Sequence, residues 1–165
     1  MQAATGSSYQ PGRLHPGFTQ LHQGDPMNAM APPRPTELHG CQVRLAAKPA
    51  AVGQARCHVQ AAIGAWAVPV DEDVAILLTS ELVTNAITHQ PGRTITLAIV
   101  CSPGQLRVDV HDTSRALPVL APAPVDAETG RGLMLVDTLS DEWGSYRTPA
   151  GKAVYFTLAP PPGLA

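Results

Sequence analysis

The sequence predicts an α+β fold, a two-layer α/β sandwich in which helices cover one face of a mixed, mainly antiparallel sheet. Three observations point to it. Helix-like and strand-like segments do not alternate strictly along the chain, which favours a sheet with its helices on one side. Four of the strand-like segments form two close pairs, which favours hairpins. The 165 residues, 44% of them hydrophobic, suffice for one core and are too few for two comfortable ones.

The folded unit is expected over residues 39–159. Residues 1–38 are crowded with Pro, Gly, Gln, Ser and His and show no hydrophobic period, which predicts a disordered N-terminal tail. Residues 160–165, PPPGLA, are by composition a short C-terminal tail. One domain with two loose ends is therefore the expected organisation.

The first half of the domain is predicted to be a strand followed by two helices. Residues 41–46 are the first strand candidate, and Pro49 stands where the first turn of a helix tolerates a missing N–H. Apolar residues recur on one face from there to about Trp66, which predicts the first helix. The segment VPVDEDV then provides a loop whose acids suit the start of a second helix, predicted over 74–89.

The second half is predicted to contain two hairpins separated by a loop and a short helix. β-Branched and alternating residues predict strands over 94–100 and 105–112, joined by CSPG. Residues 113–129, rich in proline and alanine, suit neither a strand nor a long helix and are expected to form a loop. The remaining elements are a helix from about 133 to 140 and strands over 142–147 and 153–158.

Three polar side chains interrupt the apolar faces of these elements. If residues 74–89 are helical, a turn of about 100° per residue places Glu81 and Asn85 within about 20° of the line through the apolar side chains. Alternation along 105–112 likewise puts Asp112 on the apolar face of its strand. A carboxylate removed from water without a partner is costly. We therefore expect a cation or a donor-rich ligand beside these residues.

A magnesium-bound adenine nucleotide satisfies all three groups if they line one cavity. The glycine-flanked start of the third helix offers free N–H groups to phosphate. Asn85 offers a neutral oxygen to Mg²⁺. The ionised Asp112 accepts a hydrogen bond from the amino group of adenine and repels the oxygen that guanine carries there. Glu81 then lies near the phosphates, where a general base belongs.

In this order and spacing, the motifs resemble the N, G1 and G2 boxes of the GHKL (Bergerat) ATP-binding fold. The resemblance is carried by the E-x-x-x-N of Glu81 and Asn85, the strand-ending Asp112, and the G-x-G of Gly130 and Gly132. Among the branches of this fold, SELVTNAITH, GRGLMLVDTLSDEWG and GKAVYF are most similar to the bacterial anti-sigma-factor serine kinases. The resemblance covers roughly residues 45–158.

The resemblance implies a serine/threonine protein kinase that uses ATP and Mg²⁺ and regulates transcription. It makes Glu81 the catalytic base toward a serine hydroxyl and Asn85 the ligand of Mg²⁺. The implied partners are an anti-anti-sigma protein of the STAS type, which carries the serine, a sigma factor, and a second copy of the chain in a homodimer. The implied nucleotide-binding residues are Asn85, His89, Asp112, Thr129, Gly130, Arg131, Gly132 and Leu133.

Two departures from the family pattern keep other functions open. Asp112 is followed by Thr113–Ala116 where the family has glycines, and the last box has Ala153 where a threonine is common. The alternative is a partner-binding module that keeps the fold and is catalytically weak or inactive. A histidine-kinase catalytic domain is a third hypothesis, disfavoured because no dimerising helical hairpin is recognised before the domain.

Each motif also has a purely structural explanation. Asp112 can cap the loop that follows its strand, and His89 can interact with the dipole at its helix end. Gly130 and Gly132 can form a tight turn into a helix. Glu81 and Asn85 can lie at a solvated edge if the apolar stripe of their helix is rotated from the assumed one.

Composition disfavours several other classes of protein. The net charge of −2 and the charged fraction of 15% provide no basic stripe for nucleic acid or an anionic membrane. No apolar run approaches the roughly 18 residues of a membrane span, and no secretory signal is recognised, which predicts a cytoplasmic protein. Cys41, Cys57 and Cys101 are predicted to be free thiols acting as small core residues. Cysteine and histidine spacing gives little support for a zinc site.

Overall fold

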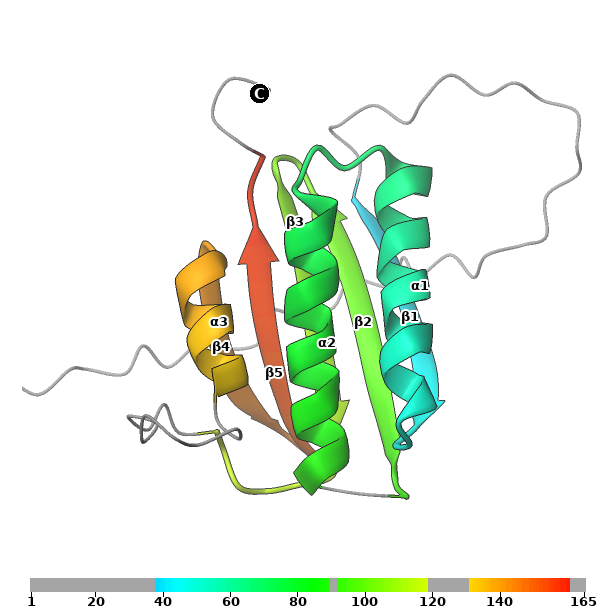
Figure 1. The fold of residues 1–165 in the computed structure, drawn as a ribbon, viewed down its shortest axis with the longest axis vertical. Helices are drawn as coiled ribbons and strands as arrows, with labels where there is room; N and C mark the ends of the chain where they lie inside the picture. Colours follow the sequence, from blue (N-terminus) through cyan, green and yellow to red (C-terminus); the bar gives the residue numbers. More distant parts are fainter. Residues whose placement is uncertain (1–37, 90–91, 119–130, 161–165) are drawn as a thin grey trace, which may run out of the picture.

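The computed structural model describes residues 38–89, 92–118 and 131–160 of the chain. Every predicted element is present, and its bounds differ from the expected ones by no more than two residues (Figure 1). The elements, in chain order, are β1 (His39–Ala46), α1 (Ala50–Trp66), α2 (Glu72–His89), β2 (Thr94–Ser102), β3 (Gln105–Asp112), α3 (Arg131–Leu139), β4 (Glu142–Thr148) and β5 (Gly151–Leu158).

The strands form one sheet in the order β1-β2-β3-β5-β4, and the three helices of the described segments lie on one face of it (Figure 1). This confirms the α+β, two-layer prediction. The four pairings between neighbouring strands are all antiparallel, so the mixed character that the sequence suggested is not found among the described strands. The physical reason is that β4 and β5 form a hairpin whose second strand runs back beside β3.

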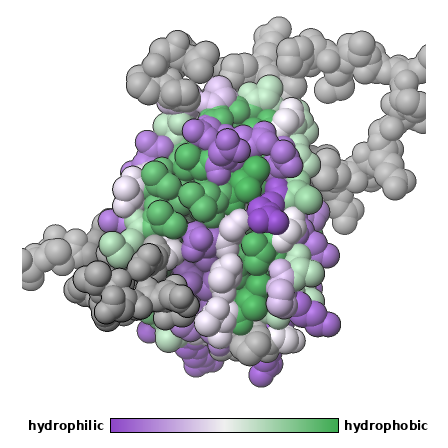
Figure 2. Space-filling model, in the orientation of Figure 1, coloured by the Kyte–Doolittle hydropathy of each residue, from purple (hydrophilic) through white to green (hydrophobic). Residues whose placement is uncertain are grey.

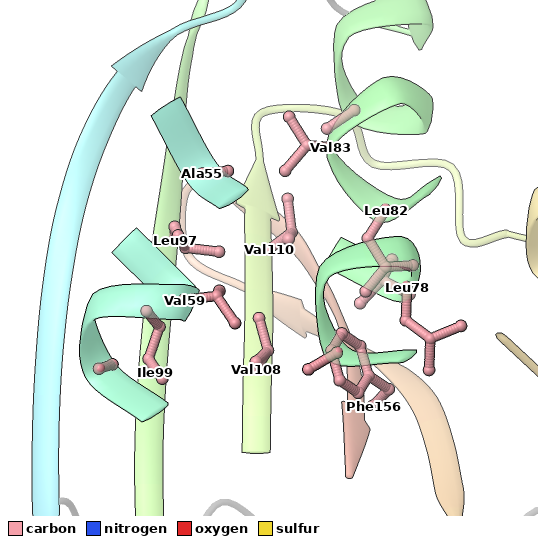
Figure 3. Close-up of a cluster of buried hydrophobic side chains, with 14 of the residues drawn as sticks. Ala55, Val59, Leu78, Leu82, Val83, Leu97, Ile99, Val108, Val110 and Phe156 are labelled. Atoms are coloured by element: carbon pink, nitrogen blue, oxygen red, sulfur yellow. The ribbon is translucent and has the colours of Figure 1, made fainter. Parts of the chain in front are cut away.

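The core fills the space between the helices and one face of the sheet (Figure 3). Alternate residues of the inner strands point to it, as the period of two requires. Alanines on α1, among them Ala51 and Ala55, let this helix approach the sheet closely. The fully buried large side chains of the core include Val59, Leu78, Leu97, Ile99, Val108, Val110 and Phe156.

The ends of the first two helices follow from local chemistry. The Asp71 carboxylate accepts a hydrogen bond from the Val74 N–H at 3.1 Å, and the Asp71 carbonyl accepts one from the Ala75 N–H at 3.0 Å. Asp71 is thus an N-cap, which explains why α2 begins two residues before the predicted start. At the end of α1, Ala67 is left-handed with φ of 48°, and the N–H of Val68 bonds to the carbonyl of Ile63 at 3.1 Å. This closure turns the chain toward α2.

Apolar side chains are also exposed on the helix-bearing face, where Figure 2 shows a green patch toward the end that holds the start of α2 and the end of α3. Exposed apolar surface of this kind is typical of interaction sites. Among the described helices, none combines the length and apolar character that a bilayer crossing needs. The exposed large apolar residues of α2 and α3 are Leu77, Met134, Leu135 and Leu139.

Several sequence predictions fall partly outside the described residues. The two predicted tails, 1–38 and 160–165, do so apart from Leu38 and Pro160, and so does the predicted loop from residue 119 onward. The three cysteines are free. Cys41 and Cys101 pack against the core, but Cys57 is exposed. The prediction of a core position is therefore wrong for Cys57, which lies on the side of α1 away from the sheet.

Candidate functional site

Predicted site residues of α2, β3 and α3 lie toward the same end of the domain, the lower end in Figure 1, where β5 also begins. α2 and β3 both finish there, and α3 and β5 both begin there. The antiparallel pairing of β3 with β5 produces this arrangement, because the last residue of one strand must face the first residues of the other. Residues far apart in the sequence therefore come together in two places, Asp112 with Lys152 at the ends of two inner strands and Glu81 with Gly132 between two helices.

Glu81 lies directly against the start of α3. A Cβ built on Gly132 would overlap the Oε2 atom of Glu81 and would stand 3.5 Å from its Cβ and Cδ atoms. Gly132 therefore allows the carboxylate to approach the backbone of α3. The Glu81 side chain is half-buried, and within the described residues it takes part in no hydrogen bond or ion pair. Its acceptors are thus available to a ligand or a substrate hydroxyl.

Asn85 follows Glu81 by one helical turn and is also half-buried. Its amide makes no hydrogen bond to the described parts of the chain. Both side chains flank the apolar stripe of α2 and do not lie at its centre, so the predicted inward orientation is only half correct. The stripe is rotated because Thr79 and Val83 are buried in it. Thr79 is tolerated there since its hydroxyl donates to the Ala75 carbonyl at 2.7 Å.

Asp112 occupies the buried end of β3, on the helix-bearing face, as strand alternation predicted. Its Oδ1 atom accepts a hydrogen bond from the Ser114 N–H at 2.7 Å. Asp112 therefore caps the loop that follows its strand, as the structural explanation of this residue predicted. Its Oδ2 atom lies 3.2 Å from Nζ of Lys152, and the two side chains are only 3% and 5% exposed. The predicted adenine acceptor is thus one half of a buried ion pair.

Lys152 is a site residue that the sequence patterns did not identify. Register pairs it with Asp112, whereas Ala153 pairs with His111 and faces the opposite side of the sheet. Ala153, which stands where the family commonly has a threonine, is therefore not the residue of β5 that lies beside Asp112. Lys152 could have been identified from the GKAVYF segment only with knowledge of how β3 and β5 pair. A shift of this pairing by one residue would move Lys152 to the opposite face of the sheet.

Gly151 is a second residue that sequence reasoning missed. A Cβ at this position would overlap the carbonyl oxygen of Asp112 and would lie 2.7 Å and 2.8 Å from the Cα and carbonyl carbon of Thr113. These are backbone atoms, which cannot move aside as the end of a side chain can. Gly151 thus lets β5 pass close to the chain that leaves β3, and this approach positions Lys152 against Asp112.

The other predicted ligand residues have different outcomes. Thr129 and Gly130 lie outside the described residues, and the side chain of Arg131 is not described, although the residue begins α3. Leu133 is half-buried and packs against the core. His89 is exposed at the last turn of α2, where a helix-end histidine suits the dipole.

The opposite face of the sheet carries a polar network of residues from β3, β4 and β5. Arg107 donates two hydrogen bonds of 2.8 Å to Asp109, and the Tyr146 hydroxyl donates to Asp109 at 3.1 Å. The Arg107 guanidinium also lies 3.6 Å from the centre of the Tyr155 ring. The network ties β3 to β4 and β5 and so supports the register on which the Asp112–Lys152 pair depends.

Burial and charge shift the pKa values of this network. Burial raises the pKa of Tyr146 to about 12, and the adjacent Asp109 adds to the rise. Burial lowers the pKa of Arg107, but the hydrogen bonds and charge of Asp109 outweigh it, so this pKa is raised and the guanidinium remains charged. Burial lowers the pKa of His111, although Asp109 and Asp112 act in the opposite direction.

The residues present fit a nucleotide with its metal ion. No group of three or more His, Cys, Asp or Glu side chains among the described residues could hold a metal ion by itself. A magnesium ion that takes one protein oxygen and several phosphate oxygens needs no such group, and the amide of Asn85 is available for it. Glu81 and Asn85 provide polar groups without a hydrogen-bond partner among the described residues, and Lys152 has donors beyond its contact with Asp112.

Known proteins are similar to this chain in sequence or in fold. The chain is 35% identical over 89 residues to the uncharacterized protein SCO4941 of Streptomyces coelicolor, a match that covers 52% of this chain and 85% of the relative. A solved structure, the RsbU and RsbW domains of Rv1364c from Mycobacterium tuberculosis, superposes with a TM-score of 0.55 at 19% identity. The match covers 74% of this chain and 32% of that one, so this chain spans about a third of that chain's length. Residues 45–158 match the histidine kinase-like ATPase domain, and the chain therefore belongs to this nucleotide-binding family.

Proposed function

We propose that this protein is an ATP-binding serine kinase of the anti-sigma-factor type, which phosphorylates an anti-anti-sigma protein and thereby regulates a sigma factor. The observation that carries the proposal is the contact between Glu81 and Gly132. It holds an unpartnered carboxylate against the start of α3, where the free N–H groups of a helix suit phosphate. The RsbW domain named in the solved structure belongs to a protein with the same fold and is consistent with this assignment.

Each residue of the site has a defined part in the proposed reaction. When bound, Mg-ATP supplies the phosphoryl group and the metal charge that neutralises it. Asn85 provides an oxygen for the metal ion, and the start of α3 from Arg131 provides backbone N–H groups for phosphate oxygens. Glu81 accepts the proton of the partner's serine hydroxyl while the serine oxygen forms the new bond to the γ-phosphorus, the bond from that phosphorus to the bridging oxygen breaks, and ADP leaves. Positioning and charge neutralisation provide most of the rate enhancement in such transfers.

The decisive experiment combines the protein with Mg-ATP and an anti-anti-sigma protein of the STAS type and measures phosphoserine on the partner. The Glu81→Gln variant should lose on the order of 10²–10⁴-fold in transfer rate, as expected for loss of a general base. It should still bind ATP, which is measured as a nucleotide-dependent rise in melting temperature. The matched control is Asp73→Asn, which removes an exposed carboxylate from the first turn of the same helix. Equal transfer by the wild type and Glu81→Gln would exclude Glu81 as the base.

A second candidate function is a partner-binding module without turnover. It is favoured by the ion pair of Asp112 with Lys152, which occupies an acceptor that adenine was predicted to use. The exposed apolar side chains of α2 and α3 also suit a docked protein. The same assay separates the two functions. Binding of a sigma factor or a STAS-type protein with no phosphoserine and no nucleotide-dependent rise in melting temperature supports the module.

A further inference from the structure

The ammonium group of Lys152 is buried and has unused donors. Its side chain is 5% exposed, and Nζ lies 3.2 Å from Oδ2 of Asp112, which is its ion-pair partner in the described parts of the chain. An ammonium has three N–H donors, so one contact leaves the others without an acceptor among these residues. A buried charge is stable only when its remaining hydrogen-bonding groups are satisfied. The arrangement points to a ligand that brings an acceptor to Lys152.

The pair also changes what the Asp112 position can recognise. An isolated carboxylate accepts hydrogen bonds only, and therefore favours a 6-amino group and repels a 6-oxo group. Lys152 places a donor directly beside this acceptor and brings the net charge of the pair to zero. Adenine presents a 6-amino donor next to the N1 acceptor, whereas hypoxanthine and guanine present a 6-oxo acceptor next to the N1–H donor. Lys152 as donor and Asp112 as acceptor can together match either the adenine pattern or the 6-oxopurine pattern.

We propose that Lys152 is a base-specificity residue which donates to the 6-oxo group of a purine, so that the site binds 6-oxopurine nucleotides as well as ATP. The inference rests on the proposed nucleotide site and adds the residue that decides its base selectivity. Asp112 keeps acceptor capacity for this role, since a carboxylate has about four lone-pair sites and the structure uses one on Ser114 and one on Lys152.

The wild-type protein tests the proposal through a series of three nucleotides that differ at the 6-position. ATP carries an amino group, inosine triphosphate an oxo group beside an N1–H donor, and purine ribonucleoside triphosphate a hydrogen beside an unprotonated N1. Dissociation constants are measured by calorimetry with excess Mg²⁺. If Lys152 donates to the oxo group, inosine triphosphate binds about tenfold or more tighter than the 6-hydrogen analogue, as a hydrogen bond from a charged donor predicts. If the carboxylate dominates, the order of these two is reversed and the proposal is overturned.

Variants then assign the effect to Lys152. Lys152→Met keeps the length of the side chain and removes the charge, and it should make inosine triphosphate the weakest ligand of the three while ATP changes less. The matched control is Lys48→Met, which removes an exposed lysine charge outside the site. Lys152→Gln, which retains a neutral donor, should give an intermediate preference. If these variants fail to fold, a wild-type order in which inosine triphosphate binds more weakly than the 6-hydrogen analogue still overturns the proposal.

The outcomes separate this inference from the function on which it rests. Tight binding of ATP together with the reversed order of the two analogues overturns the role of Lys152 and leaves the kinase proposal standing. Absence of binding by all three nucleotides overturns both. A preference for inosine triphosphate over the 6-hydrogen analogue that persists in Lys152→Met assigns the donor to another group and overturns the inference.

Discussion

The backbone of Gly132 lies so close to the carboxylate of Glu81 that a side chain at residue 132 would displace this carboxylate. The two residues belong to different helices, and their contact is where α2 meets the start of α3. We expect the position of this carboxylate to affect the rate of phosphoryl transfer strongly and the free energy of unfolding only weakly.

Replacing Gly132 with Ala should separate the effect on transfer activity from the effect on stability. The new Cβ would overlap Oε2, the end of a flexible side chain, so Glu81 should rotate away while the helices keep their places. Alanine is also favoured over glycine inside a helix by about 1 kcal/mol. We expect the free energy of unfolding to change by less than about 1 kcal/mol, while phosphoryl transfer falls on the order of a hundredfold through misplacement of the base. Urea unfolding and the phosphoserine assay measure the two effects.

Gly53→Ala is the control for this substitution, because it adds a Cβ inside α1 at an ordinary 3.8 Å from the nearest atom, on Arg56. It should leave transfer unchanged. Full transfer activity in Gly132→Ala would show that the position of Glu81 does not matter for the reaction.

Gly151→Ala should destabilise the fold. Here the added Cβ meets the backbone of Asp112 and Thr113, which cannot rotate aside. Overpacking of this kind costs about 1–3 kcal/mol, so the urea midpoint should fall with an unchanged slope. Gly64→Ala, whose Cβ would have no neighbour within 4 Å, is the control. A wild-type midpoint for Gly151→Ala would mean that β5 can move away from the end of β3 at little cost.

Asp112 and Lys152 should be strongly coupled in a double-mutant cycle. Each side chain is almost fully buried, so Asp112→Asn or Lys152→Met alone leaves an uncompensated charge inside the protein. Each single change should lower the free energy of unfolding by about 3–5 kcal/mol. The double variant buries no charge and should be more stable than the sum of the single effects predicts. Simple additivity in urea unfolding would argue against an ion pair in the folded state.

His111 should make stability depend on pH in mildly acidic solution. Its pKa is lowered from 6.5 in the folded protein, chiefly by burial. The unfolded chain therefore binds the proton first as the pH falls below 6.5, and stability is lost over the interval down to the folded-state pKa. The contribution is fully present above that interval. In His111→Gln, the urea midpoint should fall less between about pH 7.5 and about pH 5.5 than in the wild type.

The exposed His58 on α1 provides the comparison for this measurement. His58→Gln should keep the wild-type dependence on pH, because both substitutions remove one imidazole, but His58 is exposed whereas His111 is half-buried. Identical pH profiles for His111→Gln and the wild type would rule out His111 as the source.

The secondary structure could be predicted because its causes are local. Alternation of apolar residues in 105–112 predicted β3 and the face on which Asp112 lies, and the structure confirms both. The start of α2 differed by two residues because the Asp71 side chain, rather than the apolar period, sets where this helix begins. The orientation of Glu81 and Asn85 was half right, since Thr79 enters the core once its hydroxyl is satisfied by Ala75. Such a bond is not visible in a hydrophobic pattern.

The sequence by itself determined the elements, their order, the family motifs and the positions of Glu81, Asn85 and Asp112, because these depend on periodicity and spacing within short segments. Only the tertiary structure decided which residues meet. The pairing of β3 with β5 places Lys152, and not Ala153, beside Asp112, and the packing of α2 against α3 places Gly132 on Glu81. The first contact depends on the register of two strands, which turns every side chain of a strand to the other face when it moves by one residue. The second depends on how two helices distant in the sequence pack against each other.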